Sequence, residues 1–129
     1  MNALSWLALV VGCGLGGLTR AWISAWCTRS FPGLLPLGTL VVNLTGSFLL
    51  GLITATAYSL EAPKVELTYL FAATGFCGGL TTFSTLGWQM TRLWRAGQRS
   101  VALLFYGVNT LGALVCALLG FVIGGGTHG

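Results

Sequence analysis

The sequence has very few charged side chains, and this scarcity excludes most soluble folds. Six Lys or Arg and two Asp or Glu occur among 129 residues, whereas 55% of the residues are hydrophobic. Soluble domains are typically about a quarter charged. A soluble chain of this length could not hide so much apolar surface in one core. We therefore expect part of the solvent around this protein to be lipid.

Acidic residues are the scarcest polar type. Glu61 and Glu66 are the only two, and they lie in one short segment. No nucleophile, base and orienting acid can be assembled from this set, so we expect no enzyme. A small four-helix multidrug or cation exporter would need a carboxylate within the membrane for proton exchange, and no apolar stretch contains one. That class is the weaker alternative for a membrane protein of this size.

Metal-binding patterns are also missing from the cysteines and the histidine. No CxxC or Cys/His ligand spacing occurs, so we interpret the cysteines as small apolar packing residues. The four are Cys13, Cys27, Cys77 and Cys116.

Long uncharged stretches take up most of the chain. A membrane-spanning helix needs about 20 mostly apolar residues. Four stretches qualify, and they predict spans over about 4–27, 37–59, 67–90 and 101–124 in a single transmembrane domain, 1–129. A secretory signal peptide begins with basic residues, but Met1–Leu4 has no charged side chain, so we expect the first stretch to be a span.

The charges lie in the short connections and are unevenly divided. Four spans place both termini on one side, with the first and third connections on the other. The side with the first and third connections carries four arginines, namely Arg29, Arg92, Arg95 and Arg99, whereas the side with the termini carries Lys64. The positive-inside rule then favours external termini. Such positive charge suits anionic lipid headgroups better than nucleic acid.

Arg20 interrupts the first span. It follows Gly12 and Gly16 at steps of four, so the three residues share one helix face. Small residues at this spacing let helices approach closely in lipid. Arg20 therefore either points inward, toward packed protein or an aqueous vestibule, or extends to the membrane interface.

Polar residues also recur on the second and fourth spans. Thr39, Asn43 and Ser47 form a stripe at steps of four on the second, and Tyr106 and Asn109 share a face of the fourth. Such residues either make hydrogen bonds between helices or line a polar path.

The third span contains a sequence that is unsuited to a continuous helix. Gly78-Gly79 precede Thr81 and Thr82, which predicts a helix break near 78–82. Backbone can leave the helix within a membrane only where protein or a cavity satisfies it, and such breaks bind ions. The available Arg, Asn, Ser, Thr and Tyr side chains are rich in hydrogen-bond donors, which favours an anion.

Several of these stretches together resemble one family, the Fluc (CrcB) fluoride channels. The stretches are residues 12–20, Gly38-Thr-Leu-Val-Val-Asn43 with Gly46-Ser47, Gly75-Phe-Cys-Gly-Gly-Leu-Thr-Thr-Phe-Ser-Thr85, and Asn109 with Gly112. The resemblance covers the whole chain. It implies an all-α membrane protein with four transmembrane helices, the third broken, that assembles as an antiparallel, dual-topology dimer.

The resemblance also implies a function and its residues. The protein would export fluoride passively through two pores per dimer across the bacterial inner membrane, with a structural sodium ion (Na⁺) at the centre. The backbone carbonyls of Gly78 and Thr81 would hold the sodium, and Arg20 would lie near the vestibule. Fluoride pathway residues would be Asn43, Phe83 through its ring edge, Ser84, Thr85, Thr39, Ser47, Tyr106 and Asn109. These groups suit fluoride because hydroxyls, amides and the positive edge of a phenyl ring can replace its water.

Two features depart from the family pattern. Leu86 stands where a second phenylalanine is usual, so one ring of the aromatic pair is missing. The arginine bias is also larger than a chain that inserts in both orientations should have. Both features would fit a half-functional or non-conducting subunit that pairs with a related sister chain. A homodimer remains the first expectation because Asn43, Phe83 and the central motif are intact.

Overall fold

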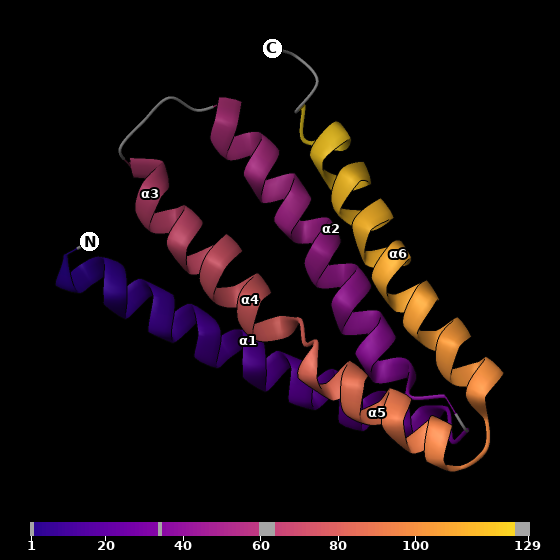
Figure 1. The fold of residues 1–129 in the computed structure, drawn as a ribbon. Helices are drawn as coiled ribbons and strands as arrows, with labels where there is room; N and C mark the ends of the chain where they lie inside the picture. Colours follow the sequence, from indigo (N-terminus) through magenta and orange to yellow (C-terminus); the bar gives the residue numbers. More distant parts are fainter. Residues whose placement is uncertain (1, 34, 60–63, 126–129) are drawn as a thin grey trace.

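Helices make up nearly all of the computed structural model, which describes residues 2–33, 35–59 and 64–125 (Figure 1). The described residues contain no β-strand. In chain order the helices are α1 (Ala3–Ser30), α2 (Leu37–Ser59), α3 (Lys64–Tyr69), the π-helix η1 (Leu70–Cys77), α4 (Gly78–Leu80), α5 (Ser84–Arg95) and α6 (Arg99–Ile123).

Three of these helices are long and apolar enough to cross a membrane. Within the described residues they are α1, residues 37–58 of α2, and α6. The protein is therefore a multi-pass membrane protein. The predicted span 37–59 has the same bounds as α2. The predicted span 4–27 is shorter than α1 at both ends, and the predicted span 101–124 begins two residues after α6 begins and ends one residue after α6 ends.

The third predicted span, 67–90, is not a single helix. It is divided among the end of α3, η1, α4 and most of α5. The helix ends at Leu80, and Thr81 is extended, with φ −78° and ψ 156°. The predicted break at 78–82 is thus found, with its non-helical residues at 81–83. The wide π turns of η1 just before the break were not predicted; such turns are frequent at functional sites.

Local sequence explains where the other helices begin and end. The Asn2 side chain caps α1 by accepting a hydrogen bond of 2.9 Å from the Ser5 N–H. Pro32 follows α1 and Pro36 precedes α2, positions where proline disfavours helix continuation or is tolerated at a start. Gly97, with φ +80°, supplies the left-handed turn between α5 and α6.

Glycine lets α1 lie directly on the backbone of η1 and α4. A Cβ atom at Gly12 would overlap the Phe71 carbonyl oxygen, and one at Gly16 would overlap the Phe76 carbonyl oxygen and lie 2.8 Å from the Leu80 nitrogen. The predicted close packing of this glycine pair is therefore confirmed.

Glycines also allow close backbone contact between α2 and α6, which pack side by side (Figure 1). A Cβ at Gly51 of α2 would overlap the Ala117 carbonyl oxygen, and one at Gly120 of α6 would overlap the Phe48 carbonyl oxygen. Large apolar side chains remain on the outer faces of the molecule, among them Trp22, which is 70% exposed. Such a surface suits lipid.

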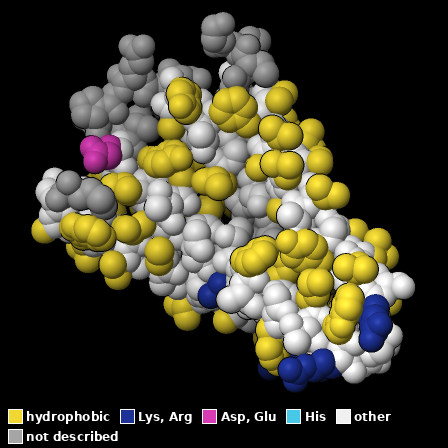
Figure 2. Space-filling view, in the orientation of Figure 1, with side chains coloured by type: hydrophobic (Ala, Val, Ile, Leu, Met, Phe, Trp, Pro, Cys, Tyr) yellow, Lys and Arg dark blue, Asp and Glu magenta, His cyan; other side chains and the backbone are white. Residues whose placement is uncertain are grey.

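The acidic side chain in view lies at one end of the molecule and most of the basic side chains lie at the other (Figure 2). The turn between α5 and α6 places arginines at one end, together with the end of α1. Glu66 lies at the other end, near the start of α1; Glu61 falls outside the described residues. The structure thus reproduces the uneven charge distribution expected from the sequence.

Candidate functional site

A cavity of about 600 Å³ lies at the helix break, between α2, η1, the break itself and α6. Seven of the residues singled out from the sequence line it: Asn43, Ser47, Gly78, Thr81, Phe83, Leu86 and Asn109. The remaining ones, Thr39, Ser84, Thr85, Tyr106 and Arg20, lie outside its lining.

Asn43 pairs with the backbone of the break. Its Nδ2 donates to the Thr82 carbonyl at 3.0 Å, and its Oδ1 accepts from the Thr82 N–H at 2.8 Å. The side-chain amide thereby takes the place of a neighbouring peptide group. Because backbone polar groups must be satisfied within a membrane, this pairing stabilises the break.

The orientation of two side-chain amides follows from that pairing. A backbone N–H can only donate, so the Asn43 atom that faces the Thr82 N–H must be Oδ1. Its Nδ2 then donates to Asn109 at 2.7 Å, which requires the facing atom of Asn109 to be Oδ1. A chain of hydrogen bonds thus runs from the break through α2 to α6, with a fixed direction.

Asn109 ends this chain with an unused donor. The residue is 1% exposed, and its Nδ2 is buried with no hydrogen-bond partner among the described residues. A buried donor without a partner is unfavourable by about 1–3 kcal/mol. An acceptor that reached this atom would remove that penalty.

The ring of Phe83 stands beside that of Tyr106. Their centroids are 6.3 Å apart and their planes make an angle of 72°, an edge-to-face contact. Phe83 is 69% exposed, so its ring lies at the surface of the subunit. Aromatic edges carry partial positive charge, so an exposed ring here offers a further attraction for an anion.

Hydroxyl groups cluster just after the break. Thr82 Oγ1 lies 3.1 Å from Thr85 Oγ1 and 3.3 Å from Ser84 Oγ, and it accepts from the Thr85 N–H at 3.2 Å. Ser84 is exposed and Thr85 is half-buried. The Thr82 hydroxyl thus caps the start of α5, and the three hydroxyls together form a cluster of rotatable donors and acceptors next to the cavity.

Arg20 reaches the break from α1. Its Nη1 donates to the Thr81 carbonyl at 3.1 Å, and the side chain is half-buried. Of the two placements that the sequence left open, the structure therefore has the one that points toward packed protein. The guanidinium satisfies a carbonyl that the break removes from the helical ladder.

Backbone carbonyls at the end of α4 could hold a cation. The Thr82 N–H, which would close the helical turn on the Gly78 carbonyl, donates to Asn43 instead. A Cβ at Gly78 would meet nothing within 4 Å, so the approach to this residue is open. Carbonyl ends of helices carry partial negative charge. In the described residues, no group of three or more His, Cys, Asp or Glu could hold a metal ion.

Leu86 has two environments. It lines the cavity, yet it is only 2% exposed and belongs to a core cluster with Leu93, Ala102 and Phe105. The side chain thus fills space between α5 and α6 as well as facing the cavity.

The polar stripe of α2 does not act as one unit. Thr39 is buried one turn from Asn43 and lies outside the cavity lining, whereas Ser47 lines the cavity. The stripe is divided because the break meets α2 only from Asn43 onward.

Thr82 is the site residue that sequence reasoning missed. Both of its backbone groups and its hydroxyl hold the site together. The pair Thr81-Thr82 after two glycines indicated a break, but the sequence could not show which of the two threonines would face Asn43.

Fold and site together define a class: a multi-pass α-helical membrane protein with hydrogen-bond donors gathered at a break between short helices. Residues 7–121 match the family described as CrcB-like protein, Camphor Resistance (CrcB). The chain therefore belongs to the CrcB-like family.

Relatives of similar length carry one common name. The chain is 40% identical over 115 residues to "Fluoride-specific ion channel FluC 1" of Streptococcus pneumoniae serotype 4, covering 89% of this chain and 95% of that protein. It is 39% identical over 125 residues to "Fluoride-specific ion channel FluC" of Pyrococcus horikoshii, with 95% and 98% covered. The relative from Yersinia pseudotuberculosis, "Fluoride-specific ion channel FluC 1", is 37% identical over 117 residues, which cover 91% of each chain.

Proposed function

We propose that this protein is a fluoride-selective channel that exports fluoride passively across the plasma (inner) membrane and so limits its toxicity in the cytoplasm. The observation that carries the proposal is the ordered amide chain from Thr82 through Asn43 to Asn109, which ends in a free buried donor beside the cavity. The names of the relatives support fluoride as the ion.

The chemistry of the cavity suits a small, strongly hydrated anion. Fluoride must exchange its water for hydrogen-bond donors before it crosses apolar surroundings. Asn109 Nδ2, the hydroxyls of Thr82, Ser84 and Thr85, and the exposed edge of Phe83 supply such groups. None of them carries a negative charge that would repel the ion, and Arg20 adds a positive charge at the break.

A structural sodium ion is part of the proposal. The carbonyl of Gly78, an exposed residue, loses its usual helical partner because the Thr82 N–H donates to Asn43, and it would hold the ion together with the carbonyl of Thr81. The donor set fits, because backbone carbonyls bind hard cations without acidic side chains. The Thr81 carbonyl already accepts from Arg20, but a carbonyl oxygen has two lone pairs and can serve both groups.

We further propose an antiparallel, dual-topology homodimer with two pores. The exposed Phe83 ring and the open approach to Gly78 lie at the break, where a second, inverted copy would complete the ion path and share the sodium ion. The uneven charges of the two ends favour a second possibility, a sister chain of opposite orientation in a heterodimer (Figure 2). Leu86 in place of a second aromatic ring also supports that arrangement.

Fluoride efflux from liposomes that contain the purified protein tests the proposal. We expect rapid fluoride release, read with a fluoride electrode, and no release of chloride in parallel vesicles. Chloride release at a similar rate would refute selectivity. No fluoride release from monodisperse protein would refute the homodimer, and restored release on co-expression with a sister chain would establish the heterodimer.

A further inference from the structure

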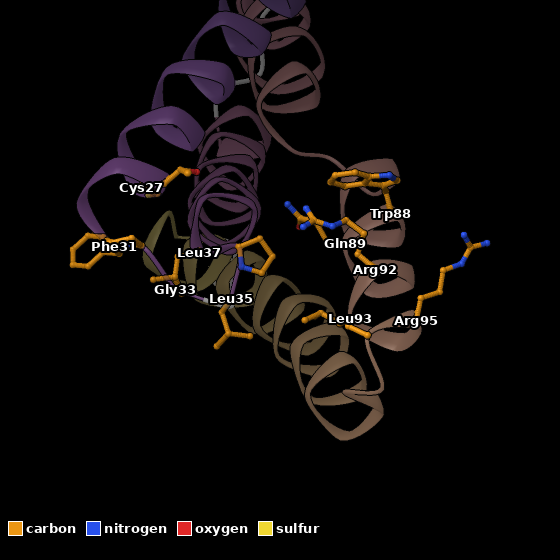
Figure 3. A pocket seen from close by; sticks show the side chains of 14 residues that line it. Cys27, Phe31, Gly33, Leu35, Leu37, Trp88, Gln89, Arg92, Leu93 and Arg95 are labelled. Carbon is orange, nitrogen blue, oxygen red and sulfur yellow. The ribbon is translucent and has the colours of Figure 1, made fainter.

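A second cavity, of about 750 Å³, lies at the arginine end of the molecule (Figure 3). One wall consists of the end of α1 and the turn that leads to α2, with Phe31, Leu35 and Leu37. The opposite wall is α5. This groove is separate from the cavity at the helix break, because the two share no lining residue.

The α5 wall is amphipathic. Trp88, Arg92 and Arg95 follow one another at steps of four and three, so they share a helix face. All three line the groove and are exposed. Leu86 and Leu93 are buried in the core cluster against α6, and Leu93 also reaches the groove. In Figure 3 the Arg92 side chain points from α5 toward the opposite wall, whereas that of Arg95 extends outward from α5 at the edge of the groove.

Two details of this wall are suited to a ligand at the membrane surface. The Arg92 Cζ lies 4.9 Å from the centroid of the Trp88 ring, a cation–π contact that positions the guanidinium. Gln89, which also lines the groove, has a buried Oε1 with no hydrogen-bond partner among the described residues. The groove therefore offers guanidinium donors for an anion and one unused acceptor for a hydroxyl.

Charge selects the kind of ligand. Glu66, the only acid in the described part of the chain, lies at the other end of the molecule, so the groove has a positive field with no described counter-charge nearby (Figure 2). Its opposite wall is apolar. A ligand that matches both walls has a phosphate, a hydroxyl and hydrocarbon chains.

We propose that this groove binds an anionic phospholipid with a hydroxylated headgroup, of the phosphatidylglycerol type. Arg92 binds the phosphate, Arg95 adds positive charge at the edge of the groove, and the headgroup hydroxyl donates to Gln89 Oε1. The acyl chains leave along Phe31 and Leu35 toward the bilayer. Trp88 lies at the level of the headgroups, where tryptophan is enriched in membrane proteins. Bidentate arginine–phosphate contacts are among the strongest polar contacts that a protein makes.

Native mass spectrometry of the full-length protein in detergent, titrated with phosphatidylglycerol, tests the proposal. We expect lipid adducts at concentrations at least about tenfold lower than with phosphatidylcholine, and loss of this preference in the double variant Arg92→Gln/Arg95→Gln. Arg99→Gln is the matched control. It removes one positive charge at the same end, where the double variant removes two, but Arg99 stacks on Trp94 at 5.3 Å and does not line the groove.

Two further experiments test how the groove recognises the lipid headgroup. Gln89→Leu should weaken phosphatidylglycerol binding and leave phosphatidic acid, which lacks the hydroxylated group, unchanged. Inorganic phosphate at millimolar concentration should not displace the bound lipid. Equal binding of phosphatidylcholine, an equal loss in Arg99→Gln, or displacement by inorganic phosphate would each overturn the proposal. Size-exclusion profiles establish that each variant is folded. Fluoride transport does not enter this test, so its result is independent of the proposed function.

Discussion

The side-chain amide of Asn43 binds both backbone groups of Thr82, a residue 39 positions away along the chain. The pairing joins α2 to the point where the helix ends at Leu80. A break within the membrane needs partners for the groups that leave the helical ladder, and here one side chain supplies two of them. Because Asn43 uses its donors on Thr82 and Asn109, its main task is to fix the geometry of the site.

Replacing Asn43 by aspartate should abolish fluoride flux. The new carboxylate could still accept from the Thr82 N–H, but it could not donate to the Thr82 carbonyl or to Asn109, and it would place a negative charge beside the ion path. We expect a fall of at least about 100-fold in the liposome efflux rate, equivalent to about 2.7 kcal/mol or more. Thr56→Val, which removes an exposed hydroxyl of α2 bonded to its own helix, is the control. Wild-type flux in the aspartate variant would remove Asn43 from the site.

Two variants of Asn109 separate its acceptor from its donor. Asn109→Asp keeps an acceptor for Asn43 Nδ2 but replaces the free Nδ2 donor with a second oxygen. We expect a flux reduced at least about tenfold, together with a lower melting temperature, because the buried carboxylate has only the Asn43 donor to replace its water. Asn109→Leu removes both groups and leaves one of the two Nδ2 hydrogens of Asn43 without an acceptor, which should destabilise the fold by about 1–3 kcal/mol. Unchanged flux in Asn109→Asp would show that the buried donor does not contact the ion.

Alanine at Gly16 should destabilise the protein far more than alanine at Gly14. A Cβ at Gly16 would overlap the Phe76 carbonyl oxygen, whereas a Cβ at Gly14 would meet nothing within 4 Å. We expect Gly16→Ala to lower the free energy of unfolding by about 1–3 kcal/mol because α1 must move away from η1. Gly14→Ala should be neutral or slightly stabilising, since alanine has the higher helix propensity. Equal melting temperatures for the two variants in detergent would contradict the observed packing.

Phenylalanine at position 86 should strain the contact between α5 and α6. Leu86 is 2% exposed and packs with Leu93, Ala102 and Phe105, so a larger ring must displace its neighbours. The expected loss is about 1–3 kcal/mol in stability. Leu86→Met preserves the volume more closely and should cost less than about 1.5 kcal/mol. A Leu86→Phe variant as stable as wild type would mean that the cavity at the break accepts the ring.

Arg20→Gln should make the proposed sodium site bind more tightly. The guanidinium donates to the Thr81 carbonyl, one of the two carbonyls assigned to the ion, and its charge opposes a second cation nearby. Glutamine retains a donor without the charge. We expect thermal stabilisation by sodium chloride, compared with potassium chloride, to reach half of its maximum at a lower salt concentration. A shift to higher concentration would show that Arg20 supports the site by positioning Thr81.

The long helices and the break could be predicted from the sequence because they depend on local residue properties. The π turns, the direction of Arg20 and the hydrogen bonds of the site depend on tertiary contacts and could not. Two glycines followed by Thr81 and Thr82 are poor helix formers wherever they occur, so the break was predictable. The π turns of η1 lie against α1 at Gly12 and Gly16, and sequence periodicity reports neither the turns nor this contact. The direction of Arg20 depends on where the Thr81 carbonyl lies. The amide chain required the register of α2 against both the break and α6, so Asn43 and Asn109 could be singled out but not connected.

The glycine contacts of α1 also restrict changes in chain length. Gly12 and Gly16 lie against carbonyl oxygens of Phe71 and Phe76, and Arg20 reaches Thr81 one turn farther along. Inserting or deleting one residue between Gly12 and Arg20 would rotate everything beyond it by about 100° around the helix. Either a side chain would then meet the backbone of η1, or the guanidinium would leave the break for lipid. Length variation among functional versions of this chain is therefore expected in the connections and at the termini, and not within this stretch of α1.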